Sequence, residues 1–169
     1  MAKNKFKYTS VQQFGMLKSK FWGTGKLTHN GFVWYNDFAP TPLSDTYKLK
    51  IDYQVGYYPN AFILNPKPLP LAQGAERLPH TYNTKTQRLC LFKPDFVEWT
   101  SAMSIADTIV HWAVLWMFFY ESWVCTGKWL GGGHGNWDVT PKEKKKSCNT
   151  VENLNELTGR TLGNILDCW

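Results

Sequence analysis

Residues 47–55 alternate strictly between large apolar and polar side chains, and this run constrains the fold more than any other part of the chain. Tyrosine, leucine, isoleucine, tyrosine and valine occupy the odd positions, while lysine, aspartate and glutamine separate them. A period of two predicts a β-strand with one face against a core and the other in water. Gly56 is expected to end this strand.

Two neighbouring segments suit strands that pair with residues 47–55. Aromatic residues fill Phe32 to Phe38, and the apolar run 61–64 follows a Tyr-Tyr-Pro-Asn turn. Together the three segments predict an antiparallel meander. Residues 23–31 contain three glycines and Asn30, so we expect a turn-rich connection before the first of these strands.

Two helices are predicted, one near the amino end and one after Cys90. Thr9 to Lys20 carries apolar residues at Val11, Phe14 and Leu17, a spacing typical of a short amphipathic helix. Ser104 to Trp123 is the main helix, and we expect its apolar face to pack on the sheet. That face contains Ile105, Ile109, Trp112, Trp116, Phe119 and Trp123. Ser101 or Ser104 is expected to cap its start, and Gly127 to follow its end.

The chain of 169 residues has the length of one domain, and nine Trp, ten Phe and eight Tyr predict a core of packed rings. Three prolines within residues 66–70 favour a stiff, extended segment after the third strand. We expect a domain core over about 9–140, a basic linker over 141–148 and small carboxy-terminal helices over 149–169.

The net charge of +6 comes mostly from lysines near the two ends. Such clusters are typical of solvated termini, and the alternative is steering toward an acidic protein or nucleic acid. Nucleic acid is not an expected partner. The apolar run 109–125 is interrupted by His111 and Glu121 and is shorter than the roughly 20 residues that a bilayer requires, so no membrane is expected.

The four cysteines are Cys90, Cys125, Cys148 and Cys168, and no two of them form a CxxC pair. With no secretory signal, this predicts neither a disulfide framework nor a zinc site, and it favours a reducing cytoplasm. No cofactor or metal is expected. The ordinary interpretation of Cys125 and Cys168 is packing.

Cys90 stands out because it lies in a Leu-Cys-Leu run ten residues after His80, which follows a proline. Taken alone, a cysteine between two leucines is most often a small buried hydrophobic residue. Further along the chain lie Trp99, a Glu-Ser-Trp at 121–123 and the segment 126–134, Thr-Gly-Lys-Trp-Leu-Gly-Gly-Gly-His. Gly131 to Gly133 lack the Gly-Lys-Ser/Thr ending of a phosphate-binding loop.

Together these residues, with Trp112-Ala113, resemble the bacterial ubiquitin-conjugating (E2)-like proteins of type II CBASS anti-phage operons. The resemblance covers roughly residues 31–140. It implies an α+β fold of the ubiquitin-conjugating class, with an amino-terminal helix, an antiparallel meander sheet and a long Trp-rich helix after the cysteine loop. Small carboxy-terminal helices would complete it.

The resemblance further implies that Cys90 carries the carboxy terminus of a protein as a thioester and passes it to an amine. His80 would brace the loop around the cysteine. Where eukaryotic E2 enzymes have His-Pro-Asn, this chain has His80-Thr-Tyr82-Asn83, so the oxyanion donor is open between Tyr82, Asn83 and backbone N–H groups. His134 is a weaker candidate that would border the site.

The implied cargo is the carboxy terminus of a cGAS-like nucleotidyltransferase from the same operon. Nothing in the sequence predicts an adenylating domain, so the source of the activated acyl group stays open, with a separate activating enzyme as one candidate partner. Two alternatives stay open. In the first, the chain is a non-catalytic scaffold for the cyclase. In the second, it is a cysteine deconjugase that uses Cys90 with His80 or His134.

Overall fold

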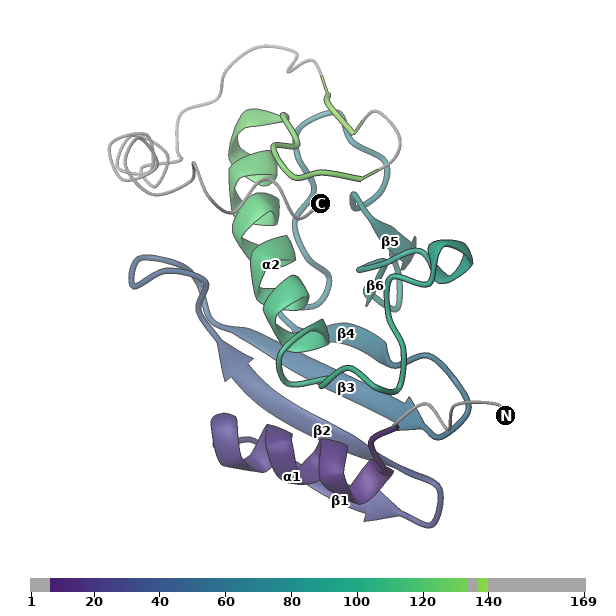
Figure 1. Ribbon diagram of the computed structural model, residues 1–169. Coiled ribbons are helices and arrows are strands. Elements are labelled where there is room, and N and C mark those ends of the chain that lie inside the picture. Colours follow the sequence, from purple (N-terminus) through teal and green to yellow (C-terminus); the bar gives the residue numbers. More distant parts are fainter. Residues whose placement is uncertain (1–6, 134–136, 140–169) are drawn as a thin grey trace, which may run out of the picture.

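The computed structural model describes residues 7–133 and 137–139. These residues form an α+β fold with a six-stranded antiparallel sheet, in the order β1-β2-β3-β4-β6-β5 (Figure 1). The strands are β1 (Thr24–Thr28), β2 (Gly31–Phe38), β3 (Tyr47–Gln54), β4 (Asn60–Asn65), β5 (Thr81–Asn83) and β6 (Arg88–Leu89). The helices are α1 (Ser10–Lys20), α2 (Ile109–Thr126) and the short 3-10 helix η1 (Pro94–Phe96).

Strand β3 confirms the prediction from the alternating run. Tyr47, Leu49, Ile51 and Tyr53 are buried, and none of them exposes more than 2 % of its surface. The strand ends at Gln54, one residue before the predicted end, and Val55 is exposed. Strands β2 and β4 pair on either side of β3, so the predicted meander is present at the centre of a larger sheet.

The turn-rich connection expected over 23–31 is instead mostly strand β1. It pairs with β2 from Thr24 opposite Tyr35 to Thr28 opposite Gly31, and the turn is confined to residues 29–30. All residues of β1 are exposed, so the strand has no apolar alternation that sequence reasoning could detect. Glycine suits this edge because a Cβ at Gly25 would lie 2.5 Å from the carbonyl oxygen of Val33.

Helix α1 packs inward through Phe14 and Leu17, as predicted, and Val11 is the exception. Thr9 and Gln12 form a capping box at its start, and Leu17 is buried, but Val11 is exposed. The buried polar residue is Gln13, whose Nε2 donates to Met103 O at 2.8 Å. Its Oε1 accepts the Ile105 N–H, also at 2.8 Å. An amide therefore fastens α1 to the segment that leads into α2.

Helix α2 begins at Ile109, five residues later than predicted. The preceding residues form turns in which Ser104 O accepts the N–H groups of Asp107 and Thr108. The N-cap is Thr108, with no capping side chain, in place of the expected Ser101 or Ser104. The expected end is confirmed, because Gly127 has φ 75° and donates its N–H to Trp123 O.

One hydrophobic core joins the sheet and both helices. In Figure 1, α1 runs along β1 and β2, whereas α2 stands beside the β5–β6 hairpin. The Glu121 carboxylate ties α2 to the β2–β3 connection, since it accepts from Ser44 Oγ at 2.6 Å and from Tyr47 OH at 3.0 Å. Burial raises the pKa of this carboxyl, while both hydrogen bonds act in the opposite direction.

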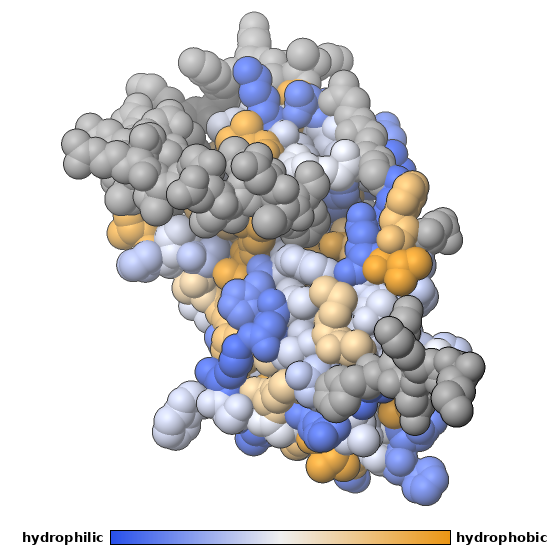
Figure 2. All heavy atoms as spheres, viewed as in Figure 1, coloured by the Kyte–Doolittle hydropathy of each residue, from blue (hydrophilic) through white to orange (hydrophobic). Residues whose placement is uncertain are grey.

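The predicted basic linker and carboxy-terminal helices lie outside the described residues, as does His134. Among the described helices, none has both the length and the apolar character needed to cross a bilayer. On the face drawn in Figure 2, orange hydrophobic surfaces are separated by blue and white ones.

Cys125, which the sequence suggested as simple packing in a chain without disulfides, is disulfide-bonded.

Candidate functional site

A β-hairpin brings His80 and Cys90 together. Strand β5 pairs with β6, with Thr81 opposite Leu89, and Cys90 N–H donates to His80 O at 2.8 Å. The two residues therefore flank the paired ends of the hairpin. The separation of ten residues in the sequence corresponds to direct opposition in the fold.

Gln87 anchors this hairpin to the rest of the sheet. Its side chain is 1 % exposed, and its Nε2 donates to Ile63 O at 2.9 Å and to Pro66 O at 3.0 Å. Its Oε1 accepts the Leu69 N–H at 2.7 Å. One amide thus holds β6 against both β4 and the proline-rich segment, so it fixes the strand that leads to Cys90.

The ring of His80 is enclosed by the segment that follows α2. Trp129 and Trp137 lie with ring centroids 5.1 and 5.4 Å from the imidazole. The backbone of Gly133 is so close that a Cβ there would lie 2.1 Å from His80 Cε1. Burial lowers the pKa of His80, so this environment favours the neutral imidazole.

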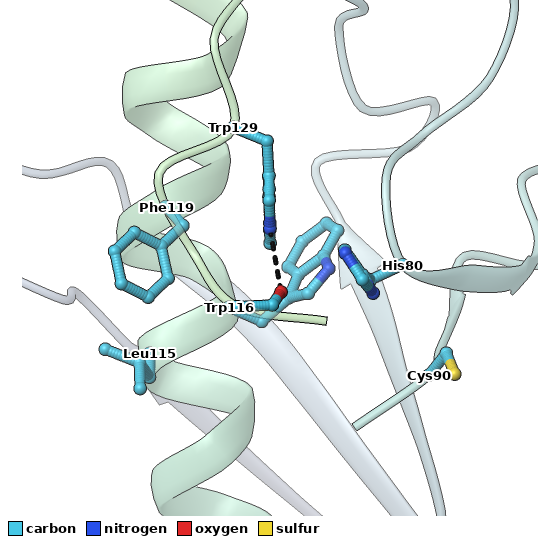
Figure 3. Close-up of a pocket in the computed structure, with 7 residues that line it drawn as sticks. His80, Cys90, Leu115, Trp116, Phe119 and Trp129 are labelled. Atoms are coloured by element: carbon cyan, nitrogen blue, oxygen red, sulfur yellow. Dashed lines mark hydrogen bonds between the residues drawn. The ribbon is translucent and has the colours of Figure 1, made fainter. Parts of the chain in front are cut away.

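Helix α2 supports the same residues from the other side. Trp116 is buried, and its Nε1 donates to Pro79 O at 3.1 Å, next to His80. A cavity of about 20 Å³ lies between the hairpin and the helix, as Figure 3 shows. It is lined by His80, Cys90, Leu115, Trp116, Phe119, Trp129 and Gly132. The space is about that of one water molecule.

Cys90 is free and half-buried. In Figure 3 its sulfur points away from the His80 ring, and the described residues show no hydrogen bond between that ring and the thiol. The geometry joins the two residues through their backbones. It suits His80 as a brace for the hairpin more than as a base that deprotonates the thiol.

The other candidate residues occupy different positions on the hairpin. Tyr82 lies at a bulge of β5, half of its surface is exposed, and its hydroxyl donates to Phe92 O over 3.4 Å. Asn83 starts the hairpin turn, where its Oδ1 accepts the Thr86 N–H at 3.0 Å. The amide oxygen of Asn83 is therefore engaged in holding the turn.

Sequence reasoning missed two residues of this region. Gln87 gives no periodic signal in the sequence. The role of a buried amide becomes visible only when the backbone groups around it are known. Arg88 gives no signal either, because its place beside the Tyr82 ring depends on how the hairpin folds. No group of three potential metal ligands lies together in the part of the chain that the structure describes.

A family model for the type II CBASS E2 protein matches residues 13–136. The match covers nearly three quarters of the 169 residues and includes most of α1, all of α2, the whole sheet and the His80–Cys90 hairpin. A comparison with curated proteins finds no significant match. The matched span agrees with the α+β architecture and with the residues that first suggested the resemblance. The chain therefore belongs to the family of type II CBASS E2 proteins.

Proposed function

We propose that this chain is an E2-like acyl carrier, in which Cys90 holds the carboxy terminus of a protein as a thioester. The observation that carries the proposal is the position of Cys90. It is a free, half-buried cysteine, held opposite His80 at the end of a hairpin, within the span that matches the E2 family. Family membership supports a role in CBASS anti-phage defence.

The chemistry consists of two acyl transfers. The Cys90 thiolate attacks the carbonyl carbon of an activated carboxy terminus, a new S–C bond forms, and the activating group leaves with the electron pair of the broken bond. An amine then attacks the thioester carbonyl and loses a proton, an amide forms, and the Cys90 thiolate leaves. The source of the activated acyl group is open, and a separate activating enzyme is one candidate.

In this proposal His80 is a positioning residue. Its backbone carbonyl receives the Cys90 N–H, and its ring is fixed by Trp129, Trp137 and Gly133. This packing supports the braced hairpin that the family resemblance implies. Backbone N–H groups and Tyr82 are the candidates for stabilising the oxyanion, since the Asn83 oxygen already accepts from the turn.

The proposed cargo is the carboxy terminus of the cGAS-like nucleotidyltransferase of the same operon. This follows from the family and from the anti-phage context. A deconjugase that uses His80 as its base is less well supported, because the base of a cysteine hydrolase contacts the thiol, and the His80 ring and Cys90 share no hydrogen bond within the described residues. His134, the other candidate base, lies outside the described residues.

The test is intact-mass analysis of the protein co-expressed with its neighbouring operon genes. We expect a wild-type adduct with the mass of a whole protein, which excess thiol removes and which Cys90→Ala lacks. Cys90→Ser should carry the same cargo as an oxygen ester that resists thiol. If no adduct forms and the cyclase co-purifies equally with the wild type and Cys90→Ala, the chain is a scaffold and the carrier proposal fails.

A further inference from the structure

A second cavity, of about 60 Å³, lies beside Cys90 on the hairpin. Leu89 and Leu91, the two neighbours of Cys90, both line it. The rest of the wall comes from the start of β4 and the residues before it, from the hairpin, and from the residues that lead into η1. It includes Tyr58, Tyr82, Arg88 and Phe92. The site of the proposed thioester therefore borders a hollow with tyrosine rings and one cation in its walls.

That cation, Arg88, has an unusual environment. Its guanidinium lies 4.7 Å from the ring centroid of Tyr82. Among the described residues, its buried Nε has no hydrogen-bond partner. Arginine stays charged in proteins, and a buried donor without a partner is costly. Arg88 thus holds a charged group two residues from the cysteine, with one buried donor that no described residue uses.

We propose that Arg88 is an acyl-donor recognition residue that binds a carboxylate in the segment preceding the cargo's carboxy-terminal residue. This inference rests on the proposed function of Cys90. A guanidinium pairs with a carboxylate through two parallel hydrogen bonds, which no neutral side chain reproduces. Tyr82 and Tyr58 supply rings against which the aliphatic part of an aspartate or glutamate packs.

The geometry sets the position of the recognised residue. Arg88 begins β6 and Cys90 directly follows the end of that strand, so at the rise of extended backbone the two residues are separated by roughly 7 Å. An extended peptide covers that distance in two residues. With its carboxy-terminal carbonyl at Cys90, the donor would therefore place at Arg88 the side chain that lies two residues earlier.

The experiment measures transfer of synthetic peptide thioesters to Cys90 by intact mass. Two peptides differ only at the residue two before the thioester, which is aspartate in one and asparagine in the other. We expect wild type to take the aspartate peptide roughly tenfold faster, as fits one charge-assisted pair. Arg88→Gln should abolish this preference, because the glutamine amide carries no charge, and Arg88→Lys should keep part of it.

Lys85→Gln is the matched control, because Lys85 is an exposed cation on the same hairpin and does not line the cavity. This variant should keep the full preference. Equal wild-type rates for the two peptides overturn the inference while leaving the carrier function intact. No acylation of wild type by either peptide refutes the carrier proposal and the inference with it. A preference that persists in Arg88→Gln shows that another group reads the carboxylate.

Discussion

Replacing Gln87 with leucine tests whether one buried amide holds the Cys90 hairpin in place. Leucine has a side chain of similar size. The φ of 54° at this position strains the backbone of either residue alike, so backbone strain does not contribute to the difference in stability. The substitution removes the partners of three backbone groups, Ile63 O, Pro66 O and Leu69 N–H. Each such group, left unpaired, costs about 1–3 kcal/mol.

Leucine recovers a part of this through apolar contact, so we expect Gln87→Leu to lower the free energy of unfolding by about 3–5 kcal/mol. That is a large share of the roughly 5–15 kcal/mol typical of a domain. Denaturant unfolding followed by tryptophan fluorescence measures it. Gln54→Leu, at an exposed end of β3, is the control and should change stability by less than about 0.5 kcal/mol. A loss below about 1 kcal/mol for Gln87→Leu would refute the reasoning.

Two further predictions concern the packing around His80. Because burial lowers the pKa of His80 from its ordinary value of 6.5, the imidazole of the unfolded chain is protonated before that of the folded chain as the pH falls. The contribution of neutral His80 to the free energy of unfolding is therefore fully present above pH 6.5 and decreases on acidification below it. His80→Asn should flatten the slope of unfolding free energy between pH 7 and 5, and equal slopes would contradict the assignment. Gly133→Ala should destabilise by about 2–4 kcal/mol and slow acylation of Cys90, since its Cβ meets the His80 ring and φ is 112°. Gly56→Ala, at φ 89° with open space around the Cβ, reports the backbone strain alone, so equal losses for the two variants would exclude the contact with His80.

The main helix shows how much of the fold local pattern could predict. Apolar steps of three and four residues identified α2, and Gly127 marked its end, because periodicity and the left-handed cap are local properties. Its start was placed too early, since residues 104–108 carry the same apolar spacing while forming turns. Strand β1 was not predicted for the opposite reason, because an exposed edge strand needs no apolar face and so shows no alternating pattern.

The candidate site divides in the same way. Cys90 and His80 were identified by their spacing and by resemblance to a family, and the structure adds that a hairpin places them opposite each other. Gln87 and Arg88 carried no signal in the sequence. The role of Gln87 comes from the backbone carbonyl groups to which its amide donates. That of Arg88 comes from its place against the Tyr82 ring and from its buried Nε, which has no hydrogen-bond partner among the described residues.

By itself, the sequence determined the alternating strand, the long helix and the family, because each depends on residues close together in the chain or on a recurring set of them. The tertiary structure decided which polar groups are buried and how the Trp129 and Trp137 rings enclose His80. It also left the buried Nε of Arg88, two residues from Cys90, without a hydrogen-bond partner among the described residues. Such contacts join segments distant in the chain. Their energies depend on burial and on the partners available, and neither quantity exists until the chain has folded.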